Sequence, residues 1–182
     1  MGSGTTLVEA KLLNRNAVGV DINPQSVSNS ERNLQFQCET NSKIFTRTGN
    51  ALNLHFIKDS SIDFICTHPP YADIIQYSSG LEGDLSLLET DAFLKEMLKV
   101  AEESYRVLKK GKVCAVMIGD IRKHKKVVPL GFRTMECFTQ AGFVNREIII
   151  KEQHNCRSTD YWEKQNQKFL LLAHEYIFVF QK

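Results

Sequence analysis

The four consecutive residues whose chemistry stands out are His68, Pro69, Pro70 and Tyr71, which follow an apolar run at residues 61–66. Two adjacent prolines cannot continue a strand ladder, because proline lacks the backbone N–H and restricts the residue before it. A buried strand must therefore end here and leave a rigid, extended backbone at the edge of a sheet. The pattern indicates either an ordinary strand end or a loop whose aromatic ring points into a ligand-binding cleft.

A second candidate half-site lies at the start of the chain, where Gly2, Ser3, Gly4 and Thr5 precede an apolar run. A Gly-x-Gly turn lets the backbone pass close to a ligand and then opens a helix whose free N–H groups face that ligand. Two glycines alone also fit a flexible tag. The signal is strengthened by Asp21, which closes a short apolar strand at the spacing expected of an acid that accepts hydrogen bonds from a ribose.

With residues 2–6, 20–24 and 68–71 in this order, the chain resembles the exocyclic-amino DNA methyltransferases, which modify adenine or cytosine with S-adenosylmethionine. That family combines a Gly-x-Gly cofactor loop with a catalytic loop of Asp, Asn or Ser followed by Pro-Pro and an aromatic residue. The resemblance implies a cofactor site made of Gly2, Ser3, Gly4 and Thr5 in the loop, Asp21 at the ribose, and Ile22 and Asn50 at the adenine. Asn50 is equally well explained as an ordinary turn residue.

The chain departs from the family pattern in two places. His68 occupies the position where the family usually has Asp, Asn or Ser, and the chain starts inside the cofactor loop, so the strand that normally precedes this loop is missing. In the family's sheet that strand is central, and its absence would leave two half-sheets with unpaired edges. We therefore expect a truncated reading frame, a fragment, or one part of a split enzyme that another polypeptide completes.

The resemblance also implies a mechanism. An exocyclic amine is a poor nucleophile, because its lone pair is delocalised into the ring, so the enzyme must accept hydrogen bonds from both amino hydrogens and hold the nitrogen in line with the methyl group. A backbone carbonyl fixed by Pro69 and Pro70 would be one acceptor, and a neutral His68 imidazole would be the other. Tyr71 would stack on a base taken out of its helix. Protonation of His68 would remove its acceptor, so activity is expected to fall on the acid side of neutrality.

Two polar segments are candidates for contact with the substrate. The dense basic run at residues 122–126 contains Arg122, Lys123 and Lys125; it is either a solvated loop or a site for nucleic-acid phosphates at the carboxyl end of a strand. The segment 151–169, which contains Arg157 and Trp162, is expected to be a substrate-facing loop. It also holds a histidine and a cysteine, but without a second ligand pair no metal site is predicted.

Composition limits the protein class. The 182 residues, 42% hydrophobic and 24% charged, predict one globular domain, which the resemblance identifies as a methyltransferase catalytic domain over residues 1–182. A net charge of +2 requires any nucleic-acid affinity to come from a local patch. No apolar stretch has the length of a membrane span. The five scattered cysteines favour reduced thiols, no zinc and a cytoplasmic location.

Hydrophobic patterning predicts an α/β fold, a doubly wound Rossmann-like sheet of class I methyltransferase type closed by an antiparallel C-terminal strand pair. The expected helices cover residues 5–14, 24–37, 91–108 and 129–141. The third helix carries an apolar stripe that is expected to be core, and Phe132, Met135 and Phe138 of the fourth are expected to face inward. The expected strands cover residues 17–21, 44–48, 62–66, 112–118, 143–150 and 170–180. Asn23 and Asp91 are expected to cap helices, and Gly111 to follow the end of one.

The leading interpretation is a DNA methyltransferase of the exocyclic-amino type. One alternative is an RNA guanine-amino methyltransferase, which the lack of an appended RNA-binding domain disfavours; another is a catalytically silent nucleic-acid-binding or partner subunit. A small-molecule methyltransferase fits the Pro-Pro-Tyr loop less well. The expected partners are DNA, with RNA less favoured, and either a second copy of the chain or another polypeptide that supplies the first strand. The sequence leaves open the target base, the recognition site and the oligomeric state.

Overall fold

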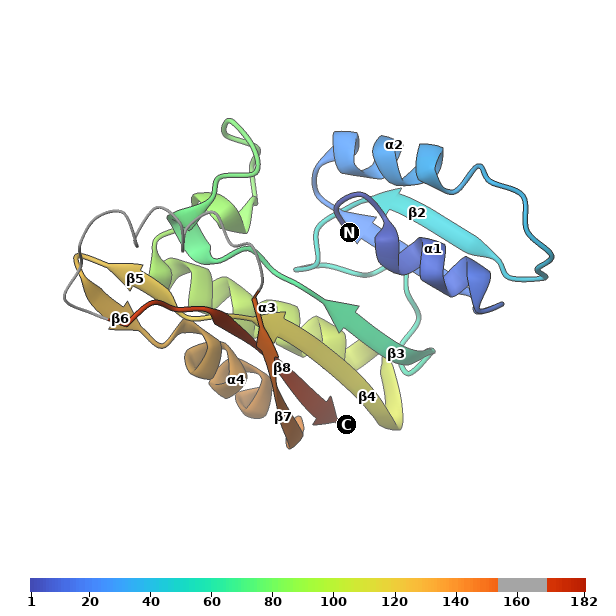
Figure 1. Ribbon diagram of the computed structural model, residues 1–182. Coiled ribbons are helices and arrows are strands. Elements are labelled where there is room, and N and C mark those ends of the chain that lie inside the picture. Colours follow the sequence, from blue (N-terminus) through green and yellow to red (C-terminus); the bar gives the residue numbers. More distant parts are fainter. Residues whose placement is uncertain (154–169) are drawn as a thin grey trace. The chain divides into compact units, whose positions relative to one another are not determined.

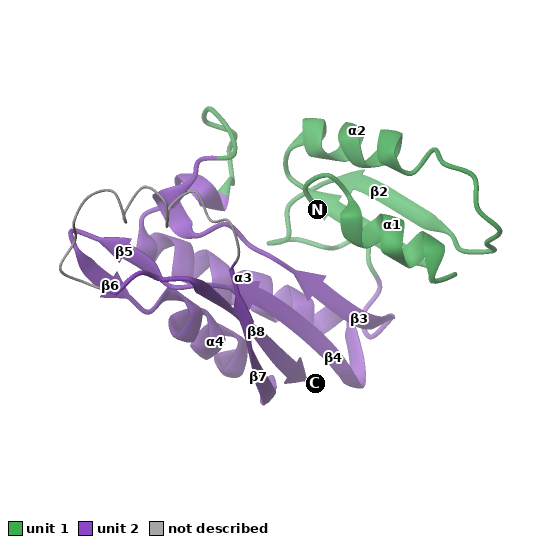
Figure 2. Ribbon diagram, in the orientation of Figure 1, with its two compact units in different colours: residues 1–57, 77–84 green, residues 58–76, 85–182 purple. Residues whose placement is uncertain are grey.

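The computed structural model describes residues 1–153 and 170–182 of the chain. The chain divides into two compact units (Figure 2). Unit 1 comprises Met1–Ile57 and Tyr77–Asp84, and unit 2 comprises Lys58–Gln76 and Leu85–Lys182. Each unit contains its own helices and its own sheet (Figure 1). The single domain over residues 1–182 stays a prediction.

Unit 1 is built on two parallel strands, β1 (Ala17–Asp21) and β2 (Ile44–Thr48), with the helices α1 (Thr5–Leu12) and α2 (Pro24–Asn33). The Asn23 side chain accepts a hydrogen bond of 2.9 Å from the Gln25 amide, as predicted for the N-cap of α2. This helix ends at Asn33, earlier than the predicted residue 37, and the Lys11 ammonium donates hydrogen bonds to the carbonyl oxygens of Leu34 and Phe36 beyond its last turn.

Unit 2 contains a four-stranded sheet in the order β3-β4-β8-β7. Its strands are β3 (Ile62–Thr67), β4 (Leu108–Ile118), β7 (Val144–Glu152) and β8 (His174–Gln181). The β3 and β4 strands are parallel, whereas β8 runs antiparallel to both β4 and β7. Among the described residues β1 pairs only with β2 and β3 only with β4, so these strands belong to two separate sheets with unpaired edges, as expected.

The helices α3 (Thr90–Val107) and α4 (Leu130–Gln140) pack against each other beside the sheet of unit 2 (Figure 1). The core between them is fully buried at Phe93 and Met97 of α3, Phe138 of α4, and Phe178 and Phe180 of β8. The Phe138 and Phe180 rings stack with their centroids 5.0 Å apart. The predicted apolar stripe of α3 is thus confirmed as core, and burial of these large side chains is what fixes both helices against the sheet.

Three local predictions were wrong in detail. Glu89, not Asp91, precedes the first turn of α3. The helix runs directly into β4, so Gly111, with φ +75°, lies inside an irregular strand pair rather than after the helix. The ring of Phe132, expected to be buried, is 39% exposed at the edge of the core.

The basic run forms a hairpin, not a loop. Its strands are β5 (Ile121–Lys123) and β6 (Lys126–Val128), and its turn residues His124 and Lys125 have φ angles of 50° and 64°. Two short 3₁₀ turns, Ala72–Ile74 and Leu85–Leu87, complete the described part of unit 2. Within residues 1–153 and 170–182, none of the helices combines the length and the apolarity needed to cross a bilayer.

The stacked core of unit 2 gives a first prediction. Replacing the fully buried ring in Phe138→Ala should lower the free energy of unfolding by about 3–5 kcal/mol, because it removes apolar contacts and leaves a cavity. Phe64 on β3 is 58% exposed, so the matched control Phe64→Ala should cost less than about 1 kcal/mol. Urea unfolding followed by circular dichroism measures both; equal losses would contradict this description of the core.

Candidate active site

The His-Pro-Pro-Tyr loop begins where β3 ends at Thr67. The Tyr71 hydroxyl donates a hydrogen bond to Glu175 Oε1 on β8. The His68 Nε2 lies 3.1 Å from the same hydroxyl oxygen and 3.5 Å from Glu175 Oε1. Two of the predicted catalytic residues, His68 and Tyr71, thus lie together, and their polar side chains both face the carboxylate of Glu175.

Glu175 is a buried carboxylate, 5% exposed, whose other oxygen Oε2 lies 2.6 Å from the Lys151 ammonium on β7. Burial alone would raise the pKa of Glu175, but the hydrogen bonds from Lys151 and Tyr71 outweigh it and lower the pKa. Burial also lowers the pKa of His68, with Lys151 acting in the same direction and Glu175 opposing. Near neutral pH, the site therefore holds an ionised Glu175 beside a neutral imidazole.

Glu175 and Lys151 were missed as site residues in the sequence. The available signal was a single carboxylate inside the apolar run at residues 170–180, since a buried charge needs a partner. The end of β4 also contributes, because a Cβ at Gly119 would lie 3.2 Å from the Tyr71 ring and 3.5 Å from Glu175 Cγ. The absence of a side chain at Gly119 therefore leaves the space that the Tyr71 ring occupies.

The predicted cofactor residues all lie in unit 1. Gly2 and Gly4 adopt φ angles of 56° and 82°, and the loop leads into α1 at Thr5. The hydroxyl oxygens of Ser3 and Thr5 lie 3.3 Å apart. The first amides of a helix have no acceptor within the helix, so the start of α1 can bind an anionic group.

Asp21 at the end of β1 faces this loop. Its Oδ2 accepts hydrogen bonds from the Gly2 amide at 3.1 Å and the Met1 amino group at 2.7 Å, and its Oδ1 accepts one from the Asn23 amide at 2.9 Å. Burial opposes these interactions, yet their sum lowers the pKa of Asp21. An ionised carboxylate has about four acceptor positions, so the residue keeps capacity for a ribose hydroxyl.

Ile22 and Asn50 also lie together, both beside Gly83 of the segment 77–84. A Cβ at Gly83 would lie 2.6 Å from Asn50 Nδ2 and 3.2 Å from Ile22 Cδ1. The Asn50 Oδ1 accepts a hydrogen bond of 3.0 Å from the Leu52 amide, which is the geometry of an ordinary turn asparagine. The residues of unit 1 thus fit a nucleoside: Asp21 can accept hydrogen bonds from its ribose, and Ile22 offers an apolar side chain to its base.

Of the predicted substrate-contact residues, the described ones share the β5–β6 hairpin. Lys123 lies 2.5 Å from Asp73 and 3.2 Å from Glu89, and although burial opposes it, these carboxylates raise the pKa of Lys123. Arg122 donates to backbone oxygens of Lys125 and Leu170. The Lys125 side chain is exposed at the turn. Arg157 and Trp162 lie outside the described residues.

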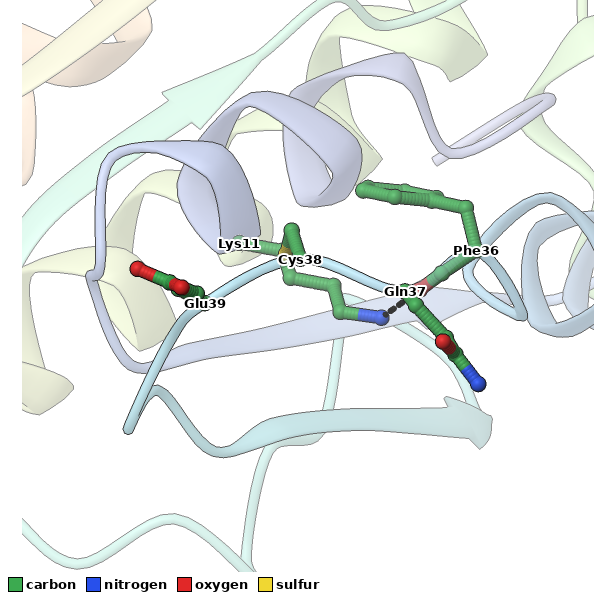
Figure 3. A pocket seen from close by; sticks show the side chains of 5 residues that line it. All are labelled: Lys11, Phe36, Gln37, Cys38 and Glu39. Atoms are coloured by element: carbon green, nitrogen blue, oxygen red, sulfur yellow. Dashed lines mark hydrogen bonds between the residues drawn. The ribbon is translucent and has the colours of Figure 1, made fainter.

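A separate hollow of about 560 Å³ in unit 1 is lined by Lys11 and residues 36–39 (Figure 3). Its lysine binds the Phe36 carbonyl at 2.7 Å and lies 4.4 Å from the centroid of the Phe36 ring, so it holds the chain after α2 in place. None of the predicted cofactor residues lines this hollow. In the described part of the chain, no group of three or more His, Cys, Asp and Glu side chains is arranged to bind a metal ion.

The parallel strands with flanking helices and the antiparallel β7–β8 pair define the class of Rossmann-like methyltransferase folds. The chain belongs to the DNA methylase family whose model, N6_N4_Mtase, matches residues 62–182. The matched region includes the whole His-Pro-Pro-Tyr loop together with Lys151 and Glu175. The family and fold predicted from the motifs are confirmed.

Individual relatives are similar over parts of their length. The Type II beta methyltransferase M.BslI of Bacillus sp. (strain NEB-606) is 28% identical over 145 residues, which cover 71% of this chain and 15% of that protein. The chain thus spans about a seventh of the length of this curated relative.

Two solved structures show the same fold. One is a SAM-dependent methyltransferase of Methanosarcina mazei, with a TM-score of 0.68 and 17% sequence identity. The match covers 100% of this chain and 88% of the Methanosarcina mazei chain. The other is the cytosine-N4-specific PvuII DNA methyltransferase, with a TM-score of 0.59 and 19% sequence identity. The match covers 73% of this chain and 47% of the PvuII chain.

The Gly-x-Gly loop gives a second prediction. A Cβ at Gly4 would lie 2.7 Å from Ser30 Cβ, whereas a Cβ at Gly2 meets nothing within 4 Å, and both residues have positive φ. Gly2→Ala should therefore cost about 1 kcal/mol of stability from backbone strain alone. Gly4→Ala should cost about 1–3 kcal/mol more, because Ser30 must move. Thermal unfolding of the two variants compares them; equal effects would contradict the close approach of Gly4 to α2.

Proposed function

We propose that this chain carries the catalytic site of a DNA methyltransferase that transfers a methyl group from S-adenosylmethionine to the exocyclic amine of adenine or cytosine. The observation that carries the proposal is the His68–Tyr71–Glu175 cluster, which lies within the region matching the DNA methylase family. The match to the DNA methylase family supports a DNA substrate. We also propose a cytoplasmic location and retain a second polypeptide chain as a proposed partner.

The residues of unit 1 would bind the cofactor. Gly2, Ser3, Gly4 and Thr5 would surround its methionine end, where the first amides of α1 meet a carboxylate. Asp21 would accept hydrogen bonds from the ribose, and Ile22 would cover one face of the adenine, with Asn50 at its edge. When bound, S-adenosylmethionine supplies an electrophilic methyl group on a sulfonium.

The catalytic loop would bind and orient the base. Pro69 and Pro70 fix the backbone so that a carbonyl oxygen accepts one amino hydrogen, and His68 accepts the other. With both amino hydrogens held, the lone pair of the amine would be directed at the methyl carbon, and the product nitrogen would lose one proton to water. Tyr71 would stack on the base.

The β5–β6 hairpin would contact the phosphate backbone. Arg122 and Lys123 are engaged in contacts that hold the hairpin in place, which leaves the exposed Lys125 as the residue at the tip best able to meet a phosphate. Arg157 and Trp162 complete the proposed substrate contacts.

Methyl transfer from labelled S-adenosylmethionine to short DNA duplexes tests the function. Tyr71→Ala should lower turnover about 10- to 100-fold, because stacking on a base contributes about 1–3 kcal/mol. Tyr71→Phe keeps the ring and loses only the hydroxyl, so it should retain more activity than Tyr71→Ala. Wild-type protein that binds DNA but transfers no methyl group would instead identify a silent subunit.

The state of His68 predicts the pH dependence. Its pKa lies below the ordinary value of 6.5, so the acceptor lone pair persists through neutrality and disappears only as the pH falls through this lowered pKa. The rate of the chemical step should be flat near neutral pH and then fall about tenfold per pH unit. Single-turnover rates measure this dependence. The fall in rate should coincide with the protonation of His68 followed by NMR, and a rate that stays constant through that protonation would exclude His68 as the acceptor.

A further inference from the structure

Three side chains in unit 2 form a continuous polar chain that ends at His68. The Lys151 ammonium lies 2.6 Å from Glu175 Oε2, the Tyr71 hydroxyl donates to Glu175 Oε1, and the hydroxyl oxygen lies 3.1 Å from His68 Nε2. Lys151 and Glu175 come from the neighbouring strands β7 and β8, and they are directly opposed in register. Tyr71 and His68 come from the loop after β3.

The direction of each hydrogen bond follows from a count of protons. An ionised carboxylate only accepts, and a tyrosine hydroxyl has a single hydrogen to donate. That hydrogen is directed to Glu175, so the Tyr71 oxygen can only accept from His68. The Nε2 atom must therefore carry a hydrogen. A neutral imidazole has one N–H, which leaves the lone pair on Nδ1.

We propose that Glu175, acting through the Tyr71 hydroxyl, fixes His68 as the Nε2–H tautomer, so that Nδ1 is the atom that accepts a hydrogen bond from the substrate amine. Glu175 is thus a positioning residue, and His68 presents a defined acceptor to the substrate. The role of Nδ1 toward an amine rests on the proposed function, whereas the tautomer does not.

Access and charge at the imidazole are consistent with this role. The His68 side chain is 48% exposed, and in the described part of the chain no hydrogen bond is made to its Nδ1. The nearby charges, Glu175 and Lys151, act in opposite directions on its protonation, and burial favours the neutral form. The neutral ring is the form to which the proton count applies.

The hydrogen bonds from Lys151 through Glu175 and Tyr71 to His68 form a relay, and Lys151 allows the direction of the Tyr71 hydrogen bonds to be reversed by mutation. In Glu175→Gln the amide oxygen should turn toward Lys151, because an ammonium group only donates, and the amide NH₂ then faces Tyr71. The Tyr71 hydroxyl would accept from this NH₂ and donate to His68 Nε2, so the hydrogen of the imidazole should move to Nδ1. In the double variant Glu175→Gln/Lys151→Glu, the carboxylate at 151 should attract the NH₂ and return the amide oxygen to Tyr71.

Two-bond ¹H–¹⁵N correlation spectra of the full-length chain at neutral pH distinguish the tautomers by which ring nitrogen is protonated. The chain has five histidines, so His68→Gln assigns the His68 signals. The wild type should show Nε2–H, Glu175→Gln should exchange the protonated and unprotonated positions, and the double variant should restore the wild-type pattern. Circular dichroism controls for folding of each variant.

An Nδ1–H tautomer in the wild type would overturn the proposal by itself, even if Glu175→Gln did not fold. An unchanged tautomer in a folded Glu175→Gln variant would also overturn it. These spectra need neither cofactor nor DNA. If the chain has the Nε2–H tautomer but transfers no methyl group, the proposed function is rejected and the role of Glu175 stands. If the chain is active but has the Nδ1–H tautomer, the proposed function stands and the role of Glu175 is rejected.

Discussion

The position of β8 between β4 and β7 is the constraint on which unit 2 depends. This strand supplies backbone partners to both neighbours, and the alternation of its side chains divides the unit into a core side and a site side. Phe178 and Phe180 are fully buried with Phe138 of α4, whereas Glu175 reaches the loop after β3. The strand that holds α4 against the sheet is therefore also the strand that positions the catalytic loop, so a change in its register would disturb both at once.

A buried carboxylate in such a strand is costly unless its lone pairs are satisfied. In Glu175 both oxygens are engaged, one by an ammonium and one by a hydroxyl. A similar arrangement occurs one residue later: Tyr176 donates to Asp120 and lies 3.0 Å from a histidine nitrogen, at His174. Asp120 in turn accepts from the Gly131 amide at the start of α4. Tyrosine hydroxyls thus link a histidine to a carboxylate twice around one strand, and each link ties two elements together.

Much of the fold could be predicted from the sequence, because it depends on local signals. The strand at 17–21, the cap at Asn23 and the stop at Pro69 and Pro70 follow from apolar runs and backbone restrictions. The Glu175 contact could not, because Tyr71 and Glu175 are 104 residues apart and only strand pairing brings them together. The hairpin at the basic run was missed for a related reason, since His124 and Lys125 adopt positive φ without the glycine or asparagine that usually indicates it.

Unit 1 is discontinuous in the sequence. Residues 77–84 belong to it although residues 58–76 and 85–182 do not, and Gly83 of this segment contacts both Ile22 and Asn50. A protein shortened after Ile57 would therefore lack part of the packing around the proposed adenine site. In evolutionary terms, the two half-sites cannot be exchanged between proteins as independent modules by a single crossover.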